Sequence, residues 1–453
     1  MSTEAEPVLA GAGSLSPEDL QRSHDRLRVL AARHRGRRLP LLWLLAGPGL
    51  LVMLGENDGP SMLSYAASGA TYGVGFFLPF IGVTFLSAIV VQEMAMRVGA
   101  VTHRGYGELV FQRFGRFWGW LSAVDLLVTN FVTLITEFIA IRVGSSFFGV
   151  PAWLSILAGL LLVALSLAGG RYWRWERAAL GLAAFNLLFL LAAVLSKPDP
   201  GAITIAFATW QPLPSGSLQT FLLLVASNVG ATVTPWMLFF QQSAVVDKGL
   251  TPRDIGQGRL DTVLGGLLAC ATGCGALVVA AALFSHHIPA TTVQGGAGFA
   301  EALRPVSGYP VAALFSLGLV EAGALAILTI SASTAYAVGE VMSGPHSFNR
   351  RLREAPSFYS FNLGLAILAA AVVLIPGAPL LAITLNANLL ATVLMPAALV
   401  FLLVLANDRE IMGSRVNPRL LNWAATGVAL LVALAGTSYA VVAFVNAVTG
   451  RPG

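Results

Sequence analysis

Two carboxylates stand in the middle of an apolar stretch near the N-terminus. In "MLGENDGPSM", Glu56 and Asp58 are followed directly by Gly59 and Pro60, a pair that interrupts helices. An unwound helix exposes backbone carbonyl oxygens beside the negative end of its first half. Carbonyl and carboxylate oxygens together favour a cation. The chemistry indicated by this stretch is therefore ion binding.

The apolar sequence around Asp58 offers it no basic partner. Within the predicted membrane spans Lys is absent, and Arg is confined to span ends apart from Arg142. A carboxylate inside a membrane is costly unless a basic residue or a bound ion neutralises it, so a metal cation is the predicted partner. Asp58 is also suited to capping the helix that follows, and the two roles are compatible.

The elements that must position these residues are membrane spans. Hydrophobic residues make up 56% of the 453 residues and charged residues only 11%, a balance that a water-soluble domain could not carry on its surface. A span needs about 20 apolar residues, and eleven runs of this kind occur. They lie near 41–74, 75–97, 115–148, 151–170, 178–196, 217–246, 259–286, 309–341, 359–376, 378–406 and 418–448.

Basic residues alternate between the loops. They gather in the tail at 1–40 and in the loops at 97–116, 171–177, 248–259, 350–353 and 409–419. The loops between these hold at most one Lys or Arg each. Short basic loops stay in the cytosol, which predicts a plasma (inner) membrane protein with its N-terminus in the cytosol and its C-terminus outside. The tail lacks the apolar core of a signal peptide and is expected to be a mobile cytosolic segment.

Two of the runs are interrupted at matching positions. The first breaks at Gly59 and Pro60, and the sixth breaks at Gly230 and Pro235, five spans later. Broken helices paired in this way, in halves of opposite orientation, indicate a substrate site at the middle of the membrane. The alternative is that these residues only kink ordinary spans. The predicted units are a first repeat at 41–196 (spans 1 to 5), a second at 217–406 (spans 6 to 10) and an eleventh span at 418–448.

These stretches resemble a known family. "GPGLLVMLGENDGPSMLSYAASGATYGV" resembles the first span of the natural-resistance-associated macrophage protein (NRAMP) transporters, with its DPGN break, and "GATVTPWMLFFQQS" resembles their sixth, with its MPH motif. "VQEMAMRVGAVTHRGYGEL" is similar to the end of their second span. The resemblance covers the eleven-span core. It implies an all-α, LeuT-like fold of two inverted five-helix repeats plus an eleventh span, and transport of divalent transition metals, commonly with protons.

The sequence departs from the family at the implied metal ligands. Asp58 stands at the aspartate position, Ser61 replaces an asparagine, and Ala231 keeps a position whose carbonyl is a ligand. Thr234 occupies the methionine position, and Asn388 stands where a tenth-span glutamine would contribute. Sulfur selects transition metals, whereas a site made of oxygens suits a hard cation that keeps some of its water. These changes are similar to the magnesium-transporting branch of the family.

Other departures concern a second carboxylate and the proton route. The usual family pattern has no carboxylate at the position of Glu56. This residue either lines a wider acidic vestibule or is a hydrogen-bonded structural residue. The histidines of the sixth span are replaced by Trp236 and Gln241, which do not titrate usefully. Glu137 keeps the glutamate of the third span, but Leu134 replaces an aspartate. Proton coupling is therefore predicted to be absent. The membrane potential would drive uptake instead, because moving two charges through 100 mV releases about 4.6 kcal/mol.

The predicted function is secondary transport of divalent cations by alternating access. Mg²⁺ is the first expected substrate and Mn²⁺ the second. Two alternatives remain open: a proton-coupled Mn²⁺ or Fe²⁺ transporter of this family, and a LeuT-fold transporter of an organic cation. No HExxH, GxSxG or P-loop motif occurs, so an enzyme is not expected. The expected partners are the transported metal ion and the lipid bilayer, without a further cofactor, a nucleic acid or a required protein partner.

Overall fold

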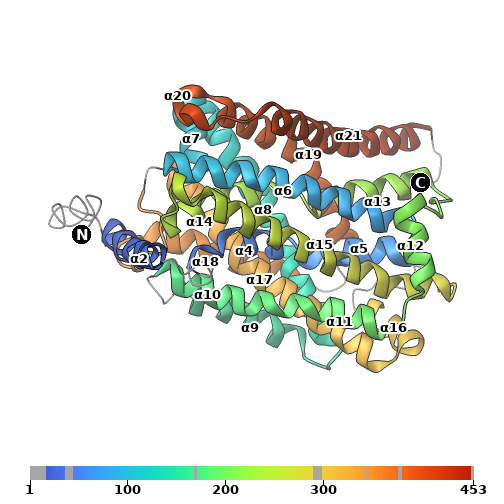
Figure 1. Cartoon of the computed structure of the whole chain (residues 1–453). Coiled ribbons are helices and arrows are strands. Elements are labelled where there is room, and N and C mark those ends of the chain that lie inside the picture. Colours follow the sequence, from blue (N-terminus) through green and yellow to red (C-terminus); the bar gives the residue numbers. More distant parts are fainter. Residues whose placement is uncertain are drawn as a thin grey trace.

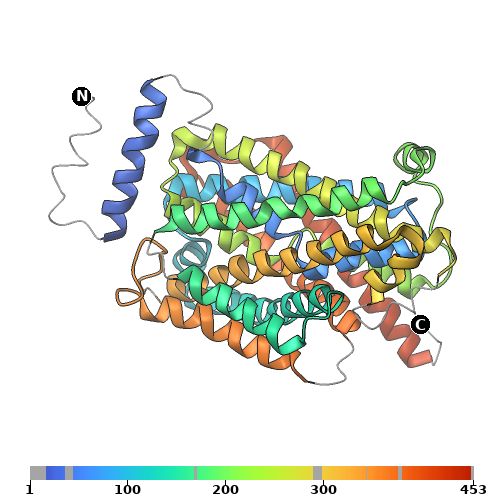
Figure 2. The ribbon, with the colours of Figure 1, turned by 90° about the horizontal axis from the view of Figure 1, so that it is seen from below.

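The computed structural model describes residues 17–35, 44–167, 171–288, 298–342, 344–375 and 380–449. Regular structure in these ranges is helical, without strands, and the long helices run side by side in one elongated bundle (Figures 1 and 2). Nine helical segments of the described chain are long and apolar enough to cross a membrane. They are α6 (Phe77–Thr102), α8 (Arg116–Ser146), α10 with α11 (Tyr172–Leu195), α13 with α14 (Leu218–Lys248), η3 with α15 (Pro252–Ser285), α17 (Tyr309–Val341), α18 (Pro356–Val373), α19 (Leu380–Asn407) and α21 (Arg419–Thr449).

The two remaining predicted spans are helical but shorter. The first is divided into α4 (Pro48–Gly55) and α5 (Gly59–Tyr72), and the fourth is α9 (Ala152–Ser166). Each of the eleven predicted runs therefore corresponds to a helix or a pair of helices. Shorter helices join them: α7 (Tyr106–Phe114), α12 (Pro200–Thr209), α16 (Gly298–Ser307) and α20 (Arg409–Met412).

Both predicted breaks are present. The first falls between α4 and α5, with Asp58 as the N-cap of α5, and the second falls between α13 (Leu218–Gly230) and α14 (Pro235–Lys248), with Thr234 as the N-cap of α14. Pro60 and Pro235 lie in the first positions of the second half-helices, where a missing N–H is harmless. The prolines therefore start new helices and do not merely kink continuous ones.

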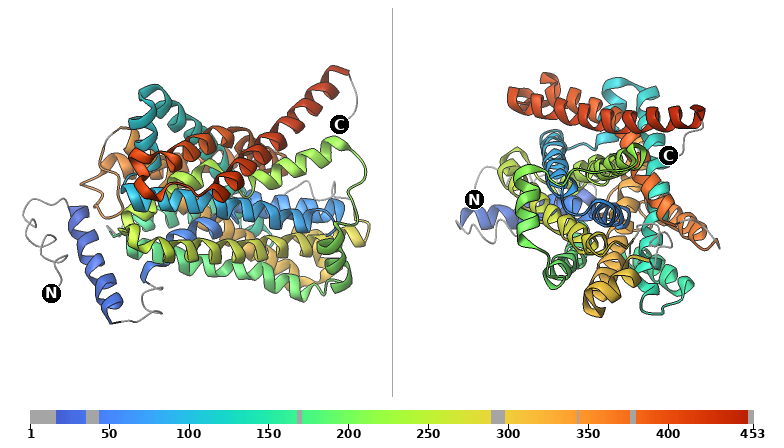
Figure 3. Two further views of the ribbon diagram at one scale, coloured as in Figure 1. Left: turned by 45° about the horizontal axis from the view of Figure 1, so that its top comes forward. Right: turned by 90° about the vertical axis from the view of Figure 1, so that its right-hand side faces the viewer.

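The packing of the broken helices follows the two repeats. α5 packs against α15 and α8, and α14 packs against their counterparts five spans away, α6 and α17. All of α5 except Thr71 is buried, as is all of α14 except Val246. Seen end-on, α21 lies on the outside of the bundle (Figure 3). Polar residues at the breaks therefore lie in the core of the molecule.

Part of the N-terminal tail forms a helix that contacts the bundle, which the sequence analysis did not predict. Residues Pro17–His34 form α2, which lies across one end of the bundle (Figure 2). Ion pairs joining α2 to the bundle include Arg22–Asp247 (3.0 Å), Arg26–Asp254 (2.6 Å), Arg33–Asp254 (2.6 Å) and Arg171–Asp25 (2.6 Å). The carboxylates are almost fully buried, and buried carboxylates need basic partners. Residues 1–16 lie outside the described ranges.

Candidate functional site

Asp58 caps the second half of the first broken helix. Its Oδ1 atom accepts a hydrogen bond from the Ser61 backbone N–H at 2.9 Å, and the residue is 1% exposed. The Ser61 hydroxyl lies beside it without a hydrogen-bond partner in the described part of the chain. The cap engages one carboxylate oxygen, so capping and ion binding are compatible at this residue.

A second carboxylate reaches the same break from α8. Glu137 accepts a hydrogen bond from the Gly59 N–H through Oε2 at 2.9 Å, while its Oε1 atom is buried without a partner among the described residues. The close approach of α8 requires glycine, because a Cβ on Gly59 would lie 2.2 Å from the Ala140 Cβ. The break therefore presents the oxygens of Asp58 and Glu137 within one small region.

The two breaks are joined by Glu56 and Thr234. Both Glu56 carboxylate oxygens lie 2.9 Å from the Thr234 hydroxyl, which donates to them, although the residues are 178 positions apart. Glu56 is completely buried and hydrogen-bonded in this arrangement. Thr234 thus faces a carboxylate at the position where the family pattern has sulfur.

Two further predicted ligands already have partners on α5. The Ala231 carbonyl accepts a hydrogen bond from the Tyr65 hydroxyl at 2.9 Å, and Asn388 of α19 donates to the Ser64 hydroxyl at 2.9 Å. These contacts lie about one turn beyond Ser61. Sequence reasoning missed Tyr65, although Ser61, Tyr65 and Ser68 recur at the spacing of one helix face.

Two of the three predicted remnants of a proton route, Trp236 and Gln241, lie on α14, and the third, Glu137, lies on α8. Trp236 and Gln241 are completely buried, and the Trp236 indole N–H and both Gln241 amide atoms have no hydrogen-bond partner in the described ranges. Trp236 packs against Phe240, with ring centroids 6.0 Å apart, and its carbonyl accepts from Ser333. These side chains are neutral, and the absence of proton coupling stays a prediction.

A family model for natural resistance-associated macrophage protein-like sequences matches residues 49–442. The chain belongs to this family. The "Divalent metal cation transporter MntH 1" of Pseudomonas aeruginosa is 27% identical over 401 residues, which cover 83% of this chain and 87% of that protein. The family membership confirms the resemblance found in the sequence, and such relatives are transporters and not enzymes.

Solved structures show the same fold. A crystal structure of the Eremococcus coleocola manganese transporter, with an aromatic bis-isothiourea substituted compound, superposes with a TM-score of 0.74 at 18% identity, covering 88% of this chain and 86% of that one. A Na⁺-coupled sialic acid symporter in a substrate-bound, outward-open state gives 0.52 at 14% identity, covering 88% and 90%. At these identities the likeness concerns the fold, and it confirms the LeuT-like architecture.

Within this family fold, a cation at the two helix breaks would meet oxygen atoms of several kinds. Among the described residues no three His, Cys, Asp or Glu side chains converge as a ligand set. Asp58, Glu56 and Thr234 are each at most 3% exposed, so the region is closed to solvent. A cation here would be coordinated by carboxylates together with hydroxyl, amide and carbonyl oxygens, which are hard ligands.

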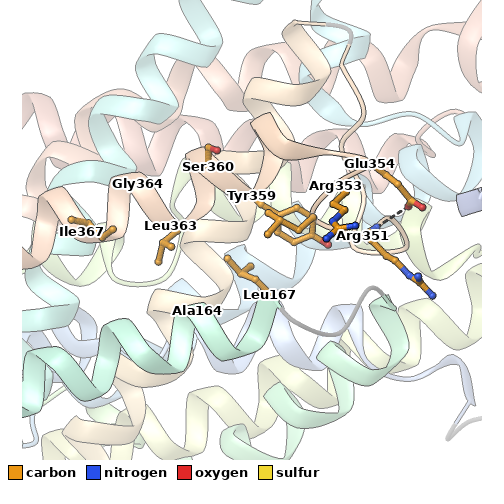
Figure 4. Close-up of a pocket in the computed structure, with 11 residues that line it drawn as sticks. Ala164, Leu167, Arg351, Arg353, Glu354, Tyr359, Ser360, Leu363, Gly364 and Ile367 are labelled. Atoms are coloured by element: carbon orange, nitrogen blue, oxygen red, sulfur yellow. Dashed lines mark hydrogen bonds between the residues drawn. The ribbon is translucent and has the colours of Figure 1, made fainter.

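A large cavity elsewhere does not belong to this region. A space of about 1040 Å³ lies between α9 and the start of α18, lined by residues that include Arg351, Arg353 and Tyr359 (Figure 4). Glu354 accepts a hydrogen bond from the Arg351 N–H there at 2.8 Å. The lining contains none of the residues at the two helix breaks.

Gly230→Ala is expected to destabilise the protein by about 1–3 kcal/mol through overpacking. A Cβ at this position would lie 1.9 Å from the Asn388 carbonyl oxygen and 2.4 Å from the Thr392 hydroxyl, so α13 and α19 would have to separate. A lower apparent melting temperature of the detergent-purified protein measures the effect. Gly427→Ala, where a Cβ meets nothing within 4 Å, is the control. Equal stability of both variants would contradict the close packing at Gly230.

Proposed function

We propose that this chain transports divalent metal cations by alternating access, with Mg²⁺ preferred over Mn²⁺ and without proton coupling. Family membership and relatives named as divalent metal cation transporters support the general activity. The observation that supports Mg²⁺ is the hydrogen bond from Thr234 to Glu56 at the second break. A hydroxyl next to a carboxylate favours a hard cation, whereas a thioether would favour a softer one.

The proposed ligands come from both broken helices and from α19. They are Asp58, Glu56, Ser61, Thr234, Asn388 and the carbonyl of Ala231. The last two accept or donate hydrogen bonds within the protein, so an arriving ion would exchange those bonds for its own. Mg²⁺ usually keeps several of its waters and takes few protein ligands directly. Only part of this set would therefore need to contact the ion at one time.

The proposed orientation rests on the basic loops. α2, α7 and α20 lie at the same end of the bundle, and they belong to the tail and to two arginine-rich loops (Figure 1). We assign this end to the cytosol, in the plasma membrane, by the rule that short basic loops stay inside. The proposed repeats span 41–196 and 217–406.

Purified protein in liposomes tests the proposal directly. With a negative-inside potential, a Mg²⁺-sensitive dye and a pH probe inside, we expect Mg²⁺ to enter while internal pH stays constant. At about −100 mV the potential supports roughly thousandfold accumulation of a divalent ion. Empty liposomes, and proteoliposomes whose potential is collapsed with an ionophore, are the controls.

Three other outcomes would contradict parts of the proposal. If only Mn²⁺ enters and internal pH falls with it, the chain is a proton-coupled manganese transporter. If Mg²⁺ enters and the pH falls, the selectivity stands and the uncoupled mechanism is wrong. If neither ion enters while choline does, the chain transports organic cations.

A further inference from the structure

A basic cavity opens at the end of the bundle that carries α2. It measures about 790 Å³ and lies between the ends of α6, α15 and α21, away from both helix breaks. Five arginines from five different elements line it: Arg33, Arg97, Arg253, Arg259 and Arg415. Such a gathering of arginines needs anionic neighbours.

Two carboxylates of the described residues, Glu93 and Asp254, form ion pairs with arginines of this cavity. Glu93 pairs with Arg97 at 3.2 Å and with Arg259 at 2.6 Å, and Asp254 pairs with Arg33 at 2.6 Å. Asp254 is shared further with Arg26 of α2. Each carboxylate is therefore shared by two guanidinium groups, so these four arginines and two carboxylates together carry a charge of +2. Guanidinium groups bind phosphate oxygens in a paired geometry, which makes phosphate the matching anion.

An exposed apolar stripe leads away from the same cavity. On α15, Leu260, Leu264 and Leu267 follow directly after Arg259 at the spacing of one helix face and are 41%, 51% and 56% exposed. On α21, Leu420 and Trp423 follow the cavity residue Pro418 and are 82% and 77% exposed. A soluble phosphate compound would make no use of this surface, whereas acyl chains would.

We propose that this cavity binds the phosphate of an anionic phospholipid, whose acyl chains lie along α15 and α21. Basic pockets between membrane helices at the bilayer surface are suited to such head groups. The lipid would belong to the leaflet on the side of α2. Because Arg33 comes from α2, the head group would also contact the N-terminal helix.

Native mass spectrometry of the delipidated full-length protein tests this site. Titration with phosphatidylglycerol and with phosphatidylcholine is expected to show preferential binding of the anionic lipid. The double variant Arg259→Gln, Arg415→Gln should weaken phosphatidylglycerol binding by about fivefold per arginine removed. The matched control is Arg174→Gln, Arg116→Gln, which removes two exposed arginines from other elements. This control should keep the wild-type affinity, and melting temperatures should show that both double variants are folded.

Competition with sn-glycerol 3-phosphate separates the lipid from a soluble phosphate. We expect this compound not to displace phosphatidylglycerol at equal concentration, because it lacks the acyl chains. Displacement at equal concentration would identify the cavity as a site for soluble anions and overturn the proposal. Equal loss of lipid in the two double variants, or equal binding of both lipids to the wild type, would overturn it as well.

Discussion

Asp58→Ala is expected to reduce divalent cation uptake in proteoliposomes by at least about 100-fold. Replacing a residue that only hydrogen-bonds to a metal ligand lowers metal affinity about 10–100-fold, and loss of a ligand itself should cost at least as much. The variant also loses the cap on the Ser61 N–H, which costs about 1 kcal/mol of stability. Uptake of Mg²⁺ and Mn²⁺ under a fixed potential measures the first effect, and thermal unfolding measures the second.

Asp58→Asn separates the two roles of this residue. Asparagine caps helices as well as aspartate does, so this variant should fold like the wild type and still fail to transport. Asp199→Ala is the matched control, because Asp199 also caps a helix, α12, by accepting from the Gly201 N–H at 2.8 Å. Wild-type uptake by Asp58→Asn would mean that the carboxylate serves the helix and not the ion.

Thr234→Met is expected to shift the preference from Mg²⁺ toward Mn²⁺ and Cd²⁺ by at least about tenfold, because a thioether favours softer cations over magnesium. The substitution also removes the hydroxyl that donates to Glu56 at 2.9 Å. Competition between ions for uptake, together with calorimetric binding of each ion, gives the ratio even if turnover falls.

Thr234→Val is the control for this shift. Valine removes the hydroxyl without adding sulfur, so the ratio should move toward Mn²⁺ and Cd²⁺ much less than it does in Thr234→Met. An unchanged ratio in Thr234→Met would show that this position does not set the selectivity.

The broken helices could be predicted from sequence because their signals are local. Gly59 and Pro60 interrupt an apolar run, and Pro235 does the same five spans later, where the structure starts α5 and α14. The capping role of Asp58 is also local, since it involves a residue three positions away. Residue type and short spacing determine these features.

The contacts between the breaks could not be predicted in the same way. Glu56 meets Thr234, and Tyr65 meets Ala231, across 178 and 166 residues of sequence. Such pairs depend on how α4 and α5 pack against the second repeat, which single-residue patterns do not contain. For the same reason, the hydrogen bond from Tyr65 to the Ala231 carbonyl, which the resemblance implied to be a metal ligand, could not be predicted.

The contact between α2 and the bundle is expected to depend on ionic strength. Its arginines Arg22, Arg26 and Arg33 retain 25%, 18% and 30% of their side-chain exposure, so water and dissolved ions reach these ion pairs. At about 1 M salt the screening length shrinks to roughly 3 Å, comparable to the separation of the paired atoms. Purification at high salt therefore favours release of α2 from the bundle, and low-salt buffers preserve its ion pairs with Asp247 and Asp254.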